Sequence, residues 1–302
     1  MRRRTTAIFP VLLLRLTLGF VFAATLFVPA RANDRDDSPA FTTVPELADG
    51  FHHLYAQQFS EARQIFDKWG SAHPDQPFGQ VAVAASYLFE EMYRQNVLSS
   101  DFFLDEKRFL HGIEGKPDPA RMQSFREALE RARTIAKQRL KQHPKDPEGL
   151  FALAMASGME SDGDAILEKK QLDGLKRMKE ANEYAKQLLA QQPDANDAYV
   201  ALGAANYVIG SLNPGYRALL WFGGIHGDKK LGMEQLTKTA DGGRYLKPFA
   251  KILLALSARR EKQNQLAQKL LLELSEEFPG NSLFAAEYAK AMGRPIPAEM
   301  KP

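Results

Sequence analysis

The chain has no cysteine among its 302 residues. This absence excludes disulfide bridges, thiolate metal sites and the lipidated cysteine that follows the leader of a bacterial lipoprotein. Exported eukaryotic proteins of this size usually carry disulfides. A cysteine-free chain that begins with an export leader is therefore typical of the bacterial envelope.

Residues 1–32 have the pattern of such a leader. Arginines occupy positions 2–4, the segment from Ala7 to Val28 is largely apolar, and Ala30-Arg31-Ala32 has the small–x–small form that signal peptidase cleaves. We expect cleavage after residue 32 and export to the periplasm or the medium, by the general secretory or the twin-arginine route. The alternative is an uncleaved anchor, although Arg15 interrupts the apolar run and leaves a short span. We expect no membrane span after the leader is removed.

The excess of positive charge belongs to the leader. The full chain has 40 basic and 37 acidic residues, and five of the arginines lie in the leader, which has no acid. The remaining chain has 35 basic and 37 acidic residues, a net charge of −2. This balance gives no footprint for nucleic acid or for an anionic membrane surface.

An amphipathic helical pattern that ends at a proline recurs four times, at Pro74, Pro144, Pro193 and Pro279. A small residue lies twelve positions before each proline: Ala62, Ala132, Ala181 and Ala267. An apolar residue lies eight positions before each proline: Phe66, Ala136, Ala185 and Leu271. Small residues let paired helices approach closely, and proline stops a helix. The pattern predicts an all-α solenoid of helical hairpins.

The first repeat resembles the tetratricopeptide-repeat (TPR) family. Gly50, Phe59, Ala62, Phe66 and Pro74 stand where that family places glycine, an aromatic residue, alanine, an aromatic residue and proline. The resemblance implies antiparallel helix pairs and a non-catalytic role as a scaffold or adaptor. We assign residues 33–43 to a disordered lead-in, 44–292 to a TPR-like domain and 293–302 to a tail.

Three of the five predicted repeats are interrupted between their two helices. The spacings between successive repeat prolines, 70, 49 and 86 residues, are not multiples of 34. The predicted insertions are residues 96–119 in repeat two, 159–170 in repeat three and 210–227 in repeat four. Insertions at this point of a hairpin emerge along one edge of a solenoid. They either plug apolar gaps or build a binding site, since long loops in compact domains are often functional.

Residues 194–290 also resemble a group of exported bacterial repeat proteins with no defined activity. The shared features are an Asn-Tyr-x-x-Gly-Ser motif, a tryptophan-bearing segment, Gly-x-x-Gly-Asp-Lys and a Gly-Arg-Tyr-Leu-x-Pro-Phe-Ala-Lys run. The segment that begins at Gly227-Asp228-Lys229 is also similar to a eukaryotic repeat family linked to inclusion-body clearance. These resemblances imply the fold and bring no chemistry with them.

No pattern for catalysis, metal or cofactor binding is present. The six histidines lack ligand spacing, and His73 and His143 precede repeat prolines, where helices end. Residues 160–164 lack the downstream glutamate of a calcium loop, so a capped turn is the better interpretation. Residues 223–230 lack the spacing of a phosphate loop and fit a helix capped by Asp228. We expect no catalytic residue, no metal, no cofactor and no enzyme activity.

The helix register predicts a binding surface on the concave face. In this repeat type the first helix of each pair lines that face, and the residues in register are Phe51, Leu54, Val81, Ala85, Leu88, Phe151, Met155, Val200, Ala204, Tyr207, Ile252 and Leu256. Peptide-clamping members place Lys, Arg and Asn ladders there, but only Asn206 and Arg259 come near that pattern. The predicted partner- or ligand-binding residues are Phe51, Leu88, Phe151, Met155, Tyr207, Trp221, Phe222 and Arg259.

An apolar groove has to be covered or used. We therefore expect a non-catalytic scaffold that binds a protein partner through its concave face and insertions. The alternative is a periplasmic carrier or transport accessory that holds an apolar small molecule. The Trp221-Phe222 segment is expected to bury an apolar side against the groove, and the competing interpretation places Trp221 in the core.

Overall fold

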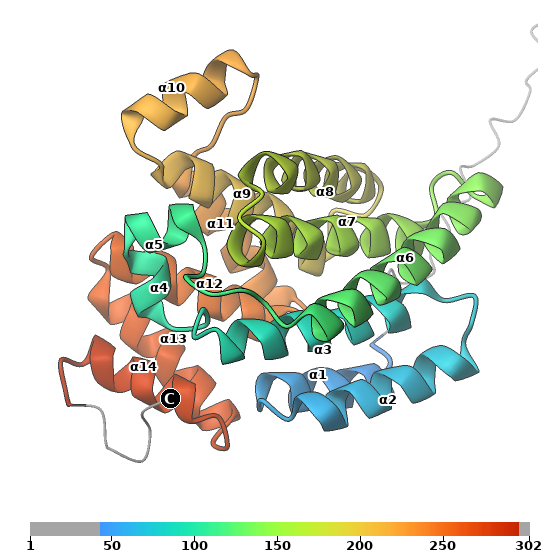
Figure 1. Ribbon diagram of the computed structural model, residues 1–302, viewed down its shortest axis with the longest axis horizontal. Coiled ribbons are helices and arrows are strands. Elements are labelled where there is room, and N and C mark those ends of the chain that lie inside the picture. The colour runs from blue at the N-terminus through green and yellow to red at the C-terminus, as the bar shows by residue number, and fades with distance from the viewer. Residues whose placement is uncertain (1–42, 296–302) are drawn as a thin grey trace, which may run out of the picture. The chain divides into compact units, whose positions relative to one another are not determined.

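The computed structural model describes residues 43–295, and within this range every regular element is helical (Figure 1). The helices are α1 (Pro45–Tyr55), α2 (Phe59–Ala72), α3 (Pro77–Arg94), α4 (Ser100–Leu104), α5 (Glu106–His111), α6 (Pro119–Gln142), α7 (Pro147–Asp162), α8 (Gln171–Gln191), α9 (Tyr199–Ser211), α10 (Pro214–Phe222), α11 (Lys229–Gly242), α12 (Lys247–Arg260), α13 (Asn264–Glu277) and α14 (Ser282–Ala291). The predicted all-α, TPR-like fold is confirmed. The predicted leader, nearly all of the lead-in and the end of the tail lie outside the described residues.

The helices form the five predicted hairpins. The pairs are α1 with α2, α3 with α6, α7 with α8, α9 with α11, and α12 with α13. Proline opens α1, α3, α6, α7 and α12 at a position where its missing N–H costs nothing. His73 and His143 are the residues at which α2 and α6 end. Asn281 caps α14, as expected, and its side chain accepts a hydrogen bond from the Leu283 N–H.

The third repeat differs from the sequence prediction. The expected interruption at residue 159 is wrong, because α7 continues to Asp162 and a π-helical turn, Gly163–Leu167, follows it directly. Met159 and Leu167 are buried, so this stretch continues the apolar contacts of α7 with the core. Ser161 Oγ donates a hydrogen bond to the Gly174 carbonyl at 2.8 Å and ties the stretch to α8.

Small residues stand at the helix seams, as the repeat pattern predicted. Ala62, Ala132, Ala181 and Ala267 each expose 2% or less of their surface. Glycine has the same role where α9 crosses α11, since a Cβ added to Gly232 would lie 2.9 Å from the Gly203 oxygen. The seams therefore leave little room for larger side chains, except where a seam position borders open space.

The motifs of the C-terminal third have structural roles. Asp228 caps α11 and accepts a hydrogen bond from the Leu231 N–H at 3.0 Å, which confirms the capped-helix interpretation of residues 223–230. The buried Asp197 carboxylate accepts hydrogen bonds from the backbone N–H groups of Arg244, Tyr245 and Leu246. The Gly-Arg-Tyr-Leu run thus forms a turn that is built around Asp197.

The first hairpin packs against the last. The Phe51 and Tyr245 rings have centroids 5.3 Å apart, and those of Tyr55 and Phe278 are 5.7 Å apart. Tyr55 Oη donates to the Tyr245 carbonyl at 3.0 Å, and Asn281 Nδ2 donates to the Tyr55 carbonyl at 2.8 Å. These contacts bring α1 beside the end of the fifth hairpin. No helix in residues 43–295 is long and apolar enough to cross a membrane.

Candidate functional site

A cavity of about 390 Å³ lies on the concave side, and its wall is mainly apolar. The first helix of every hairpin contributes to it, as the register predicted. Among the lining residues from these helices are Phe51, Leu54, Ala85, Leu88, Met92, Met155, Met159, Val200, Ala204, Tyr207, Phe249, Ile252 and Leu256. The volume and the apolar wall are those of a small-molecule site rather than of a flat recognition surface.

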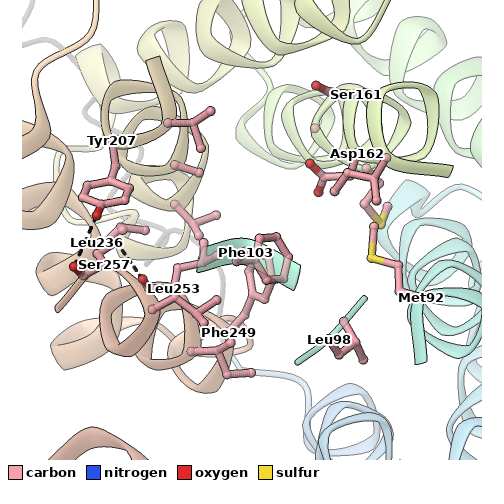
Figure 2. Close-up of a pocket in the computed structure, with 18 of the residues that line it drawn as sticks. Met92, Leu98, Phe103, Ser161, Asp162, Tyr207, Leu236, Phe249, Leu253 and Ser257 are labelled. Atoms are coloured by element: carbon pink, nitrogen blue, oxygen red, sulfur yellow. Dashed lines mark hydrogen bonds between the residues drawn. The ribbon is translucent and has the colours of Figure 1, made fainter. Parts of the chain in front are cut away.

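The insertions of repeats two and four and the π-helical turn of repeat three reach this cavity. Phe103 and Leu104 come from the insertion of repeat two, Ile166 from the π-helical turn and Leu220 from the insertion of repeat four. Figure 2 shows Phe103 from α4 standing among the side chains of the other walls. The insertions narrow the concave groove and become part of its wall, but they do not fill it.

The insertion of repeat two is fixed to the C-terminal end of the domain. The Ser100 N–H donates to Glu287 Oε1 at 3.2 Å, and Arg259 Nη1 lies 2.9 Å from Glu287 Oε2. Arg259 also donates to the Ser100 hydroxyl. This network holds α4 against α12 and α14, so the charge of Arg259 is used inside the protein.

Most polar groups in the wall are bonded to the protein. Tyr207 Oη donates to the Ser257 carbonyl at 3.2 Å, and burial raises the pKa of this phenol. Gln171 Nε2 donates to the Leu110 carbonyl at 3.1 Å. Arg260 Nη2 donates to the Ser211 carbonyl at 3.3 Å. These groups stabilise the wall and leave the interior apolar.

Among the charged side chains of the wall Asp162 is the exception, and among the uncharged ones Gln57 Nε2 and Ser211 Oγ also have no hydrogen-bond partner in the described residues. Asp162 lines the cavity at the end of α7, and among the described residues its carboxylate has neither an ion-pair partner nor a hydrogen-bond donor. Figure 2 shows the carboxyl group directed into the cavity, on the side that faces Phe103. Burial alone raises the pKa of Asp162 to about 7, because desolvation disfavours the charged form.

The structure brings five of the eight sequence-predicted site residues together. Phe51, Leu88, Met155, Tyr207 and Arg259 all line the cavity. Phe151 does not line it: its side chain is buried beside Phe78, with ring centroids 5.2 Å apart.

Trp221 and Phe222 lie on α10, outside the cavity wall, and expose 61% and 81% of their surface. The interpretation of Trp221 as a core residue is therefore wrong. So is the expectation that this segment buries its apolar side against the groove. Figure 1 shows α10 projecting away from α9 and α11, and only Leu220 from this helix reaches the cavity wall. The physical reason is local, because Asn213 caps α10 and Pro214 opens it, so a separate short helix forms here.

Sequence reasoning missed Asp162. Residues 160–164 were interpreted as a capped turn, and the helix was ended at residue 158. Asp162 lies seven residues after Met155, which is two helical turns, so the same face carries both. Continuing the α7 register by one turn would have placed an acid in the apolar groove. Residues 43–295 contain no group of three or more His, Cys, Asp and Glu side chains that could hold a metal ion.

The chain was also compared with known families, curated proteins and solved structures. No family model matches the chain, and no curated protein matches it. Among solved structures, the chain is similar to a thermophilic TPR protein of Thermus thermophilus, with 13% identity and a TM-score of 0.43 over 82% of this chain and 97% of that one. The class that the hairpins define is a TPR-like helical-repeat protein.

Proposed function

We propose that this protein is a non-catalytic carrier or transport accessory that binds an apolar small molecule in its concave cavity. The observation that carries this proposal is the apolar cavity on the concave face. The first hairpin meets the last through Phe51, Tyr55, Tyr245 and Phe278, and residues of the insertions line the space between the hairpins. A cavity of about 390 Å³ with a mainly apolar wall suits a compact or single-chain apolar ligand.

The site of action that we propose is the bacterial envelope, either the periplasm or the medium. Support comes from the basic start of the chain, the apolar run and Ala30-Arg31-Ala32. N-terminal sequencing of the protein from its own host should find Asn33 as the first residue. An intact Met1 on the exported protein would contradict cleavage.

Gly158 offers a direct test of the cavity. It lines the wall from inside α7, and a Cβ added there meets no atom within 4 Å. In Gly158→Leu the new side chain enters the cavity, and the helix gains about 0.5–1 kcal/mol because leucine is favoured over glycine in a helix interior. We expect the variant to be as stable as the wild type or more stable, and to lose binding of an apolar probe such as dodecan-1-ol in calorimetric titration.

Gly280→Leu is the matched control, because Gly280 lies in an exposed turn outside the cavity and also has open space around it. It should bind the probe as the wild type does. Equal binding by Gly158→Leu would place the site elsewhere. Failure of the wild-type protein to bind any apolar probe, together with no co-purifying small mass in native mass spectrometry, would overturn the proposal.

A second candidate function, the binding of a protein partner, is favoured by α10. Its side chains Tyr216, Leu219, Trp221 and Phe222 are exposed by 50%, 68%, 61% and 81%, and no residue of this helix is buried. A group of neighbouring exposed apolar side chains often marks an interaction site. Native mass spectrometry separates the two candidates, because a second polypeptide in the purified complex favours the scaffold.

A further inference from the structure

The cavity contains one charged group that the fold does not use, and the following inference rests on the proposed binding of an apolar ligand. Four charged side chains line the wall: Asp162, Arg259, Arg260 and Glu287. Arg259 and Glu287 form an ion pair with an N–O distance of 2.9 Å, and Arg260 donates to the Ser211 carbonyl. Only Asp162 has neither an ion pair nor a hydrogen bond among the described residues.

The acids and bases close to Asp162 in sequence are engaged elsewhere or lie outside the wall. Glu160, on the same helix, is held by Arg133 and by Arg177, whose Nε lies 2.9 Å from Glu160 Oε2. Asp164 does not line the cavity. Asp162 is therefore an isolated acid in an apolar wall, and an unpaired charge in such surroundings is costly.

A group that costs stability and supports no contact of the fold is available to a ligand. A carboxylate in such a place gains most from a cation that brings hydrogen-bond donors, since charge-assisted hydrogen bonds are stronger than neutral ones. A ligand carboxylate or phosphate would instead need a free base, and the two arginines of the wall already hold Glu287 and the Ser211 carbonyl. The free carboxylate of the wall therefore favours a ligand whose polar end is a cation.

We propose that Asp162 is the specificity-determining residue of the cavity and that the ligand is an apolar molecule with a single cationic amine. The ammonium group donates hydrogen bonds to the Asp162 carboxylate, and the apolar part lies between the walls formed by Met92 on one side and Phe249 and Leu253 on the other (Figure 2).

The test compares three probes with the same chain and different ends: dodecylamine, dodecan-1-ol and dodecanoate. Calorimetric titration of the whole protein at pH 8 should rank dodecylamine first and dodecanoate last. Asp162→Asn keeps the shape of the side chain and removes its charge. In this variant the affinity for dodecylamine should fall by about 10- to 100-fold, the range expected for lost hydrogen bonds to a charged group. The affinity for dodecan-1-ol should change by less than about threefold, because the apolar contacts remain.

Asp164→Asn is the matched control, since it removes the same charge two residues away and outside the cavity. It should leave the order of the probes unchanged. If dodecylamine and dodecan-1-ol bind the wild type equally, or if Asp162→Asn weakens both to the same extent, Asp162 does not select an amine, although the apolar site stands. If no probe binds the wild-type protein, the proposed function itself fails.

Discussion

Two aspartates of the interior, Asp197 and Asp162, differ in their surroundings. Asp197 lies at the centre of a hydrogen-bonded turn, and Asp162 lies in the cavity wall. Asp197 exposes 8% of its surface and accepts hydrogen bonds from three consecutive backbone N–H groups. Asp162 lies in an apolar wall and accepts none among the described residues. In the turn around Asp197 the carboxylate and the backbone N–H groups are hydrogen-bonded to one another. The cavity wall leaves open space and contains a carboxylate without a partner among the described residues. The first region contributes to stability, and the second is where we propose that the ligand binds.

The largest effect on stability is expected at the turn that is built around Asp197. Asp197→Ala leaves the N–H groups of Arg244, Tyr245 and Leu246 without their acceptor in a buried turn. We expect a loss of about 3–5 kcal/mol in the free energy of unfolding, measured from the urea midpoint. Asp194→Ala, at an exposed position nearby, should change the stability by less than about 0.5 kcal/mol. An unchanged midpoint for Asp197→Ala would show that the two aspartates do not differ in the way described.

The same change of charge at Asp162 should act in the opposite direction and depend on pH. Its pKa is raised by burial from 3.8 to about 7, so the folded protein keeps a proton that the unfolded chain releases. Stability is then fully present below about pH 4 and falls as pH rises to about 7. Asp162→Asn removes this penalty, so it should stabilise the protein at pH 8 by at most about 4 kcal/mol.

Urea unfolding of wild type and Asp162→Asn at pH 4 and pH 8 checks this prediction. The gain should be present at pH 8 and nearly absent at pH 4. A loss of stability at pH 8 would mean that Asp162 has a structural partner in solution.

Paired alanines sharpen the comparison further. Ala267 and Ala181 occupy the same position of their repeats and both are buried, but only Ala181 also borders the cavity. Ala267→Leu should cost about 1–3 kcal/mol through overpacking. Ala181→Leu should cost less than about 1 kcal/mol, because its side chain can turn into open space, and it should also weaken probe binding. Denaturation midpoints test both, and equal costs would show that the cavity gives Ala181 no relief.

The repeat hairpins could be read from the sequence because their determinants are local. Ala62, Phe66 and Pro74 recur at fixed spacings, and helix packing and helix ends depend on just such residues. The register also placed Met155 and Tyr207 on the cavity wall.

The arrangement of the segments around the cavity depends instead on contacts between distant parts of the chain. Ser100 and Glu287 are 187 residues apart in sequence, and no local pattern announces their hydrogen bond. The π-helical turn after Asp162 was missed because it replaces a loop by helix without a change in composition. The exposure of α10 was missed because an apolar segment favours burial, and the turn that holds it away from the core rests on its own cap at Asn213.

The smallest change in stability is expected at Trp221, an exposed aromatic residue of α10 that takes no part in the packed helix seams. It is 61% exposed on a helix without buried residues, so Trp221→Ala should change the free energy of unfolding by less than about 0.5 kcal/mol. Trp69 is the matched control, because it is the other tryptophan of the chain, packs against the core and stacks on His73 with centroids 4.4 Å apart. Trp69→Ala should cost clearly more, since it removes buried contacts. Thermal melting compares the two variants.

A large loss of stability for Trp221→Ala would mean that α10 packs onto the domain in solution. Unchanged stability with reduced capture of a partner polypeptide would make α10 a docking helix, whereas unchanged stability and unchanged binding would leave the cavity as the functional surface.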